Sequence, residues 1–190
     1  MKETKKIILA GMFLAIGAMI SIFFHSFVPG IGLIISPLHI PVLICGLFLG
    51  YKYGTVVGIL TPLLSSFMFD MPILVPMAIL MMFECGMYGF ISGVFNEKFI
   101  LYKKNKIVNI YITLIIAMII GRIVFGIASA SFTWIIADFE SWKGFKEFVE
   151  TVFIGGIPGM ILHILVIPAI MYALYHRSGK LDTEENRDLV

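Results

Sequence analysis

The chain has 190 residues, of which 59% are hydrophobic and 14% are charged, and its formal net charge is +2. Soluble globular domains average about 45–50% apolar and about 25% charged residues, so this composition is typical of an integral membrane protein. The small net charge and the lack of a continuous basic stripe argue against a nucleic-acid partner and agree with contacts to lipid headgroups.

Six apolar segments follow one another along the chain and predict six transmembrane helices. They cover approximately residues 6–27, 38–50, 53–69, 73–95, 107–134 and 148–175. The first segment is longer than the apolar region of a signal peptide, which has about 7–15 residues. We therefore expect it to remain in the protein as a membrane helix.

Some of these segments are too short or too irregular to be simple spanning helices. A helix needs about 20 residues to cross a hydrocarbon core of about 30 Å, so residues 31–37 must complete the span of segment 38–50 or fold over it as an outer loop. The sixth segment is broken by the run GGIPG at residues 155–159. Irregular backbone at membrane depth persists only where protein buries it or where it lines a wet cavity. We therefore expect a compact bundle with a pocket near its outer face, and the loops 27–36 and 69–76 as its lid.

Basic residues fall almost entirely into alternate gaps between the segments. These gaps contain Lys2, Lys5, Lys6, Lys52, Lys98, Lys103, Lys104, Lys106, Arg177, Lys180 and Arg187. The other gaps carry only Lys143 and Lys146, which are balanced by Asp138, Glu140, Glu147 and Glu150. Because cytoplasmic loops carry the excess of Lys and Arg, we expect loop 98–106 inside the cell and loop 138–150 outside.

Together these patterns predict an all-α integral membrane protein, a compact bundle of six transmembrane helices with the N- and C-termini in the cytoplasm. Residues 1–177 would form the six-helix, membrane-embedded, substrate-binding domain. Residues 178–190 are polar and would form a solvated cytoplasmic tail.

Two ionisable residues lie inside apolar segments and are the first candidates for a functional site. Arg122 lies about 24 Å along a helix from Lys106, in the outer half of the membrane, and Glu84 lies nearer the midplane. Charge in the hydrocarbon core is costly, so both should face the bundle interior. Arg122 either binds a carboxylate or phosphate of a substrate with its guanidinium fork, or pairs with Glu84 or backbone carbonyls. Glu84 either contacts a polar substrate, pairs with Arg122, stays protonated or relays protons.

Two histidines and two aromatic residues complete the candidate set. His39 opens the second segment beside the outer loop, which predicts a position at the mouth of the pocket. His163 follows the Gly/Pro break of the sixth segment, where helix packing is the alternative role. Tyr88 and Phe125 either wall a small ligand or simply pack. The predicted substrate-binding residues are therefore Arg122, Glu84, His39, Tyr88, Phe125 and His163.

The chain offers no constellation for catalysis or for a metal. It contains no Gly-x-x-x-x-Gly-Lys-[Ser/Thr] phosphate loop, no Gly-x-Ser-x-Gly elbow and no His-Glu-x-x-His motif. The two cysteines, Cys45 and Cys85, lie in apolar segments and predict no disulfide framework. We expect a binding protein without a cofactor, not an enzyme.

Small residues share one face of the first predicted helix. Gly11, Ala15 and Ala18 are spaced by four and three positions. Small side chains allow another helix to approach closely. This face either packs inside the bundle or docks a second membrane protein.

Five short runs, spread over nearly the whole membrane part of the chain, carry a family resemblance. They are SPLHIPV at 36–42, GLFLGYKYG at 46–54, TPLLSS at 61–66, Met71-Pro72 and Gly121-Arg122. Together with the chain's size and its six segments, they resemble the substrate-binding S components of energy-coupling factor (ECF) vitamin transporters, and most closely the pantothenate-type branch. The Ala-x-x-x-Ala motif that is usual in the first helix of that family stands here as Gly11-x-x-x-Ala15.

The resemblance implies a division of labour. The chain would capture a water-soluble vitamin, with pantothenate as the best guess, at the outer face of a prokaryotic plasma membrane. A transmembrane coupling protein and two cytoplasmic ATPases would supply the energy for uptake and make the subunit topple in the membrane. The alternative is a self-sufficient, proton-coupled secondary transporter of a small anionic metabolite, with Glu84 or His163 as its proton site. Such transporters often contain internal repeats, and no convincing repeat is visible here.

Overall fold

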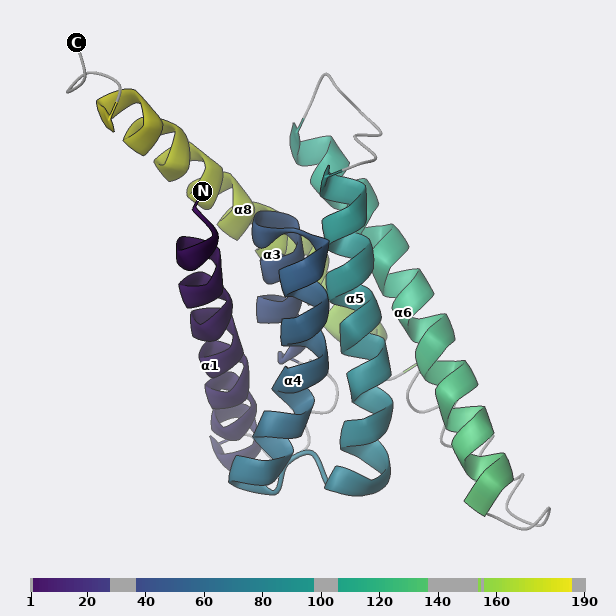
Figure 1. Ribbon diagram of the computed structural model, residues 1–190. Helices are drawn as coiled ribbons and strands as arrows, with labels where there is room; N and C mark the ends of the chain where they lie inside the picture. The colour runs from purple at the N-terminus through teal and green to yellow at the C-terminus, as the bar shows by residue number, and fades with distance from the viewer. Residues whose placement is uncertain (1, 28–36, 98–105, 137–153, 155, 186–190) are drawn as a thin grey trace.

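The computed structural model describes residues 2–27, 37–97, 106–136, 154 and 156–185, and within them every regular element is helical (Figure 1). The elements are α1 (Glu3–Phe27), α3 (His39–Leu49), α4 (Tyr51–Phe69), the kinked segment η1 (Leu74–Ala78), α5 (Ile79–Glu97), α6 (Lys106–Ile136) and α8 (Ile157–Glu185). Within η1, Val75 has extended backbone angles, with φ of −121° and ψ of 124°. The prediction of an all-α protein is confirmed for these residues. The first part of the expected lid, at 28–36, the inner loop up to residue 105 and the expected external loop 138–150 lie outside the described residues.

Four stretches are long and apolar enough to cross a membrane. They are Glu3–Phe23, Leu74–Glu97, Ile107–Phe132 and Ile157–Leu174. The short second segment behaves as its length predicts, because α3 has only 11 residues and is therefore about 16 Å long, roughly half of a hydrocarbon core. The N-terminal end of α3 consequently lies deep inside the bundle.

The described part of the predicted sixth segment consists of residue 154 and residues 156–175, with a turn at Gly156. Residues 148–153 lie outside the described part of the chain, and α8 begins at Ile157, just after Gly156. The Gly/Pro run is thus the start of this helix: Pro158 is in the first turn, where the missing N–H of proline removes no helical hydrogen bond. At its other end α8 continues to Glu185, so the backbone of the expected polar tail is helical for most of its length.

The chain ends lie at the same end of the bundle. The start of α1, the turn between α3 and α4, the end of α5 and the end of α8 all lie there, whereas the turn between α4 and α5 lies at the opposite end (Figure 1). The turn between α3 and α4 consists of Gly50, whose φ of 94° is a backbone angle that residues with a side chain rarely adopt. Nearby, Asn96 Nδ2 donates a hydrogen bond of 2.6 Å to the carbonyl oxygen of Leu47, which fixes the end of α5 against α3.

Glycines bring α3, α4 and α5 into backbone contact. A Cβ atom on Gly54 of α4 would lie 2.6 Å from the carbonyl oxygen of Gly89 on α5 and 2.6 Å from the Cα of Gly46 on α3. A Cβ on Gly58 would lie 2.6 Å from the carbonyl carbon of Cys85. Such small-residue contacts are how helices approach closely when lipid offers no hydrophobic driving force. These three helices therefore form the tightly packed centre of the bundle.

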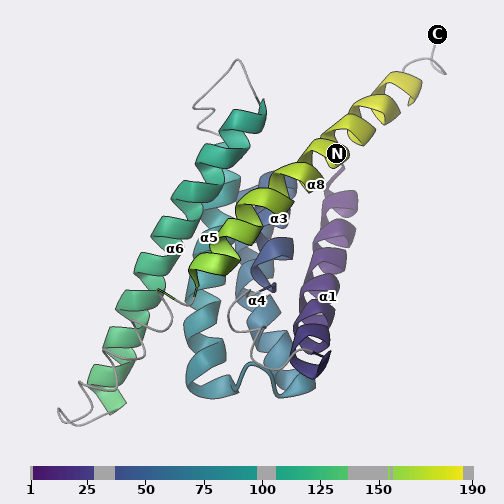
Figure 2. The ribbon, with the colours of Figure 1, turned by 180° about the vertical axis from the view of Figure 1, so that it is seen from behind.

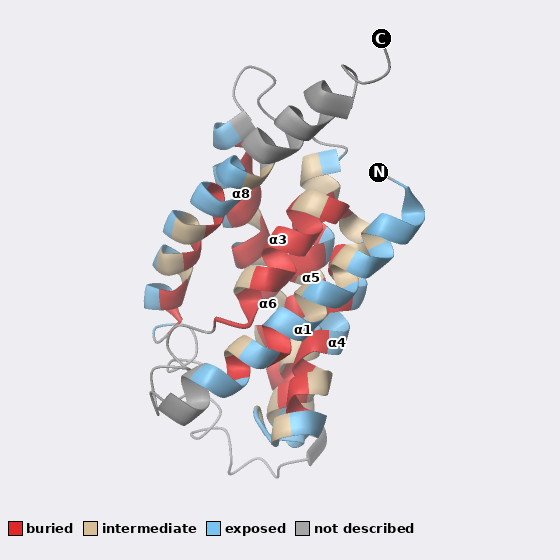
Figure 3. Ribbon diagram, turned by 90° about the vertical axis from the view of Figure 1, so that its left-hand side faces the viewer, coloured by how far each residue is buried: buried red, intermediate tan, exposed pale blue. Residues whose placement is uncertain are grey.

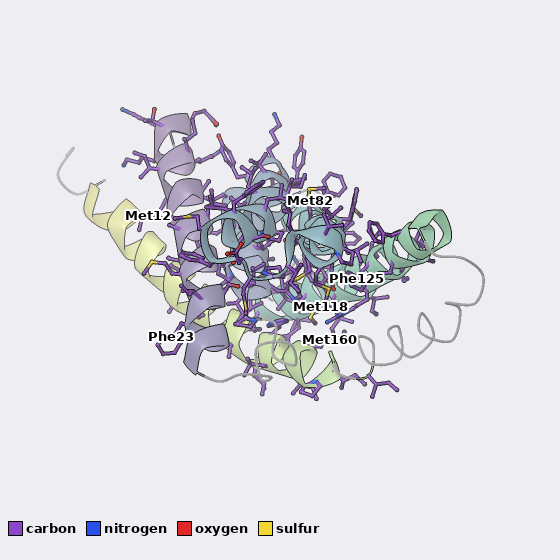
Figure 4. All side chains as sticks on the ribbon, turned by 90° about the horizontal axis from the view of Figure 1, so that it is seen from below. Met12, Phe23, Met82, Met118, Phe125 and Met160 are labelled. Carbon is purple, nitrogen blue, oxygen red and sulfur yellow. The ribbon has the colours of Figure 1, made fainter. Side chains whose placement is uncertain are left out.

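The other helices surround this centre with different degrees of exposure. Figure 2 shows α8 crossing obliquely in front of α3 and α5, with α6 beside α5. Seen end-on in Figure 4, Met118 and Phe125 of α6 lie on one side of the bundle and Met12 and Phe23 of α1 on the other. Met118 and Phe125 are buried, whereas Met12 and Phe23 are more than half exposed. Most of α1 presents exposed side chains outward (Figure 3), as expected of a helix that faces lipid or another membrane protein.

The turn between α4 and α5 is the part of the predicted lid that the structure describes. Asp70 ends α4 in the left-handed conformation, with φ of 54°, and its N–H donates to the carbonyl oxygen of Ser66 over 2.9 Å. Ser65 Oγ donates a hydrogen bond of 2.6 Å to the carbonyl oxygen of Met71. The start of this turn is thus held by the last residues of α4, while the side chain of Ile73 beyond it is exposed.

We predict that the bundle end carrying the chain termini faces the cytoplasm, because Lys52 and the N-terminal lysines lie there. In intact cells, a membrane-impermeant maleimide should label Ile73→Cys at the opposite end, and it should label Lys52→Cys only after permeabilisation. Both natural cysteines, Cys45 and Cys85, are fully buried, so they add little background. Labelling of Lys52→Cys but not of Ile73→Cys in intact cells would reverse the orientation.

Candidate functional site

Five of the six predicted substrate-binding residues meet in one buried cluster, which we call the polar cluster. It consists of His39 from α3, Glu84 and Tyr88 from α5, Arg122 from α6 and His163 from α8. All five side chains are buried, and Arg122 is the most exposed at 8%. Four helices that are far apart in sequence thus contribute polar groups to one place in an otherwise apolar interior.

The polar cluster lies in the half of the bundle away from the chain ends. At about 1.5 Å per residue, Glu84 lies about 20 Å along α5 from Glu97, and Arg122 lies about 24 Å along α6 from Lys106. His39 is the first residue of α3 and is only 1% exposed. The predicted position of His39 at the mouth of a pocket stays a prediction, because the outer loop 28–36 beside it lies outside the described residues.

Glu84 is the centre of the polar cluster. Its Oε1 lies 3.3 Å from Nε of Arg122 and accepts a hydrogen bond of 2.6 Å from the hydroxyl of Tyr88. Its Oε2 lies 3.9 Å from Nε2 of His39. The pairing of Arg122 with Glu84, one of the roles that the sequence leaves open for each residue, is therefore present in the structure.

The polar groups around Glu84 are incompletely satisfied by the described residues. Although Arg122 Nε is close to Glu84, the geometry does not make a hydrogen bond, and neither ring nitrogen of His39 has a hydrogen-bond partner within the described part of the chain. An unsatisfied buried polar group costs about 1–3 kcal/mol, and more when it is charged. A cluster with several such groups is a place where a polar ligand gains affinity, because its atoms can supply the missing partners.

Three aromatic rings pack edge to face beside the carboxylate. The ring of His39 lies 5.0 Å from that of Tyr88 at an interplanar angle of 79°, and 5.7 Å from that of His163 at 67°. These arrangements place the positive edge of one ring against the negative face of another, which is a favourable geometry for aromatic pairs. His39 is therefore held in place by both neighbouring rings.

One helix N-terminus lies in the polar cluster, because His39 opens α3 and is only 1% exposed. The start of α8 is less buried, since its first residue Ile157 is 51% exposed. The first N–H groups of a helix have no partner inside the helix, and the helix dipole adds a partial positive charge there. Membrane transport proteins use buried helix starts of this kind to hold anionic substrate groups.

The space beside Arg122 is occupied by Tyr88. A Cβ atom at Gly121 would lie 3.1 Å from Cζ of Tyr88 and still closer to the ring edge. Glycine is thus required here so that the tyrosine ring can reach Glu84. The sixth predicted residue, Phe125, is buried and follows Arg122 by three positions, on the same side of α6.

The three small residues of α1 do not share one environment. Gly11 and Ala15 are exposed, and nothing lies within 4 Å of a Cβ built on Gly11. Ala18 is buried, next to Gly17, where a Cβ would lie 2.6 Å from Cγ2 of Thr61 on α4. The exposed small-residue face of α1 therefore consists of Gly11 and Ala15, and Ala18 packs inside the bundle.

Other buried polar residues were not singled out from the sequence. Thr113 of α6 is fully buried, and its hydroxyl has no hydrogen-bond partner among the described residues. The sequence signal for Thr113 was a polar residue within an apolar segment. This signal is weak, because such residues often donate a hydrogen bond within their own helix, as the Thr61 hydroxyl does to the carbonyl oxygen of Val57. The described residues contain no group of three His, Cys, Asp or Glu side chains that could hold a metal ion.

We predict that Gly121→Ala destabilises the protein by about 1–3 kcal/mol, because the added methyl group must displace the buried ring of Tyr88. Thermal unfolding of the purified protein in detergent measures this effect. Gly11→Ala is the matched control: it is exposed on a helix with open space around it, and alanine there should be neutral or stabilising by up to about 1 kcal/mol. Equal unfolding temperatures for the two variants would contradict the packing of Tyr88 on Gly121.

Comparison with known proteins identifies the family. No curated protein and no solved structure gives a significant match. The model of the family described as the ECF transporter, substrate-specific component, matches residues 5–178, which include nearly all of the helical part of the chain. That family consists of transporter subunits, not enzymes, and together with the four candidate spans it identifies a multi-pass protein of the cell membrane. The chain therefore belongs to the substrate-specific components of ECF transporters.

Proposed function

We propose that this protein captures a water-soluble vitamin that carries a carboxylate, with pantothenate as the preferred candidate, and that the polar cluster is its binding site. The observation that carries the proposal is the buried guanidinium of Arg122. It is held beside Glu84 without a hydrogen bond between Nε and the carboxylate. The uptake itself would depend on a transmembrane coupling protein and two ATPases, with which substrate-specific components of this family generally work.

Recognition of a carboxylate would rest on Arg122 and the start of α3. A guanidinium carries five N–H donors, and Nε, which faces Glu84, supplies only one of them. The donors on the terminal nitrogens match a carboxylate in a bidentate arrangement. The N-terminus of α3, where His39 lies, adds positive potential on the same side of the bundle.

Recognition of the neutral part of the vitamin would rest on His39, Tyr88 and Glu84. Pantothenate combines one carboxylate with an amide and two hydroxyl groups, so it needs both donors and acceptors. The unpaired ring nitrogens of His39 and the carboxylate of Glu84 offer these within about 4 Å of each other. The runs at 36–42 and 121–122, which resemble the pantothenate-type branch, include His39 and Arg122 themselves, and this supports the choice of vitamin.

The coupling protein would dock on the small-residue face of α1. Gly11 and Ala15 are exposed there, and small residues permit the close approach of a partner helix. Ala18 is buried in the bundle, so it would pack α1 against the rest of the protein and would not contact the partner.

We predict that Arg122→Gln weakens pantothenate binding by about tenfold to a hundredfold, because losing a charge-assisted hydrogen bond costs about 1.5–3 kcal/mol. Arg122→Lys should recover part of the loss, since it keeps the charge but not the planar fork. Calorimetric titration of the purified protein with pantothenate measures both affinities.

The matched control is Lys52→Gln, which removes the same charge at an exposed site near the chain ends and should bind like the wild type. Thermal unfolding without vitamin is measured alongside. Normal binding by Arg122→Gln would mean that the ion pair with Glu84 is purely structural. Tight binding of a neutral vitamin in place of pantothenate would also contradict the proposed role.

We predict that Ala15→Phe reduces vitamin uptake by cells about tenfold or more, corresponding to a loss of at least ~1.4 kcal/mol in docking. Binding by the purified subunit should stay unchanged, because Ala15 is exposed and α1 contributes no residue to the polar cluster. Ile16→Phe is the control. Ile16 is also exposed on α1, but its side chain is rotated by about 100° around the helix from that of Ala15 and is already large. Equal loss of uptake in both variants, or loss of binding with Ala15→Phe, would reject this docking face.

A further inference from the structure

The charges in the polar cluster balance without a ligand carboxylate. With its carboxyl group ionised, Glu84 supplies one negative charge, and Arg122 supplies one positive charge 3.3 Å away. Two further groups, His39 and His163, carry a charge only if they are protonated. All these side chains are buried in the bundle. A vitamin carboxylate entering this site would therefore add a second negative charge where there is one permanent positive charge.

An uncompensated charge is expensive in such a place. The desolvation of a buried ion costs several kcal/mol even after the protein relaxes, and only pairing with an opposite charge offsets it. Arg122 cannot fully neutralise two carboxylates at once. The site must therefore gain a proton when the anion binds, or bind the anion weakly.

We infer that binding of the anionic vitamin is coupled to the uptake of one proton from solvent onto His39. In the bound state, Arg122 pairs with the vitamin carboxylate and the imidazolium of His39 pairs with Glu84. The proton comes from the buffer and forms an N–H bond on the imidazole, so the charges again sum to zero. This inference rests on the proposed function and adds to it the identity of the group that balances the charge.

The geometry singles out His39 as the proton acceptor. Its Nε2 already lies 3.9 Å from Oε2 of Glu84, so a proton there is placed to form an ion pair. Neither nitrogen of its ring has a hydrogen-bond partner among the described residues, and both become donors in the imidazolium. The Oε1 of Glu84 is already engaged, because it accepts the hydrogen bond of the Tyr88 hydroxyl and faces Arg122, so the open ring nitrogens of His39 are the groups placed to gain a proton.

The groups that face His39 come from several packed helices. They are Glu84 and Tyr88 of α5, Arg122 of α6 and His163 of α8. In the described parts of α1 and α4, the residues with formal charge lie at or near the helix ends: Glu3, Lys5, Lys6, Lys52 and Asp70. Among these groups Glu84 is the anion that an imidazolium at His39 can reach, while Arg122 opposes the protonation until the vitamin carboxylate neutralises it.

The coupling has a defined sign. A protein that takes up one proton on binding loses about tenfold in affinity per pH unit where its free form is unprotonated. A vitamin carboxylate is fully ionised above about pH 6, so the ligand itself contributes no slope there. Affinity for pantothenate should therefore fall as pH rises between about pH 7 and pH 9.

The test is calorimetric titration of the full-length protein with pantothenate at about pH 8 in phosphate and in Tris buffer. The two buffers differ in ionisation enthalpy, so the difference in binding heat counts the protons taken up. We expect about one proton per bound pantothenate in the wild type and about none in His39→Gln or His39→Asn. His163→Gln should still take up about one proton, whatever its affinity.

Each other result counts against the inference in a recognisable way. Binding of pantothenate to the wild type without proton uptake, or with an affinity independent of pH, overturns the coupling and leaves the proposed vitamin intact. Full uptake by both His39 variants, or its loss in His163→Gln alone, moves the proton to another residue. An absence of any pantothenate binding overturns the proposed vitamin and this inference together. If neither His39 variant folds, the proton count and pH slope of the wild type decide whether the coupling exists.

Discussion

A guanidinium at membrane depth must find its negative charge inside the protein, and this requirement organises the structure. Arg122 meets Glu84 at 3.3 Å, and the same carboxylate accepts the hydrogen bond of Tyr88 and lies near His39. Because α3, α5, α6 and α8 each contribute to the polar cluster, their relative depth and rotation are tied to it. Removing one member of a buried pair leaves the other uncompensated, which typically costs about 3–5 kcal/mol.

The glycine contacts and the short third helix make this arrangement possible. Gly54 and Gly89 let α4 and α5 touch through their backbones, and Gly121 gives the ring of Tyr88 room to reach Glu84. Because α3 has only 11 residues, its first turn lies inside the bundle. This position brings His39 and the N-terminus of α3 close to the carboxylate of Glu84. Packing that looks purely structural thereby positions the groups that would recognise an anion.

Much of this could be predicted from the sequence, and the exceptions have physical reasons. Arg122 and Glu84 stood out because charges in apolar segments are rare and must face the interior. The contact between His39 and His163 depends on the oblique crossing of α8 (Figure 2), which hydropathy does not encode. The burial of Ala18 depends on which side of α1 faces α4, and three small residues at helical spacing do not reveal that. The family resemblance was confirmed over residues 5–178, whereas the choice of vitamin stays a prediction.

The measurement that tests the central claim most directly is a thermodynamic cycle between Arg122 and the carboxylate of the ligand. Wild type and Arg122→Gln are each titrated with pantothenate and with pantothenol, the neutral alcohol in which a hydroxymethyl group replaces the carboxylate. If the guanidinium binds the carboxylate, the wild type prefers pantothenate and the variant loses that preference, with a coupling of about 1.5–3 kcal/mol. A coupling near zero, with both proteins discriminating the two ligands equally, would contradict the account and assign Arg122 to Glu84 alone.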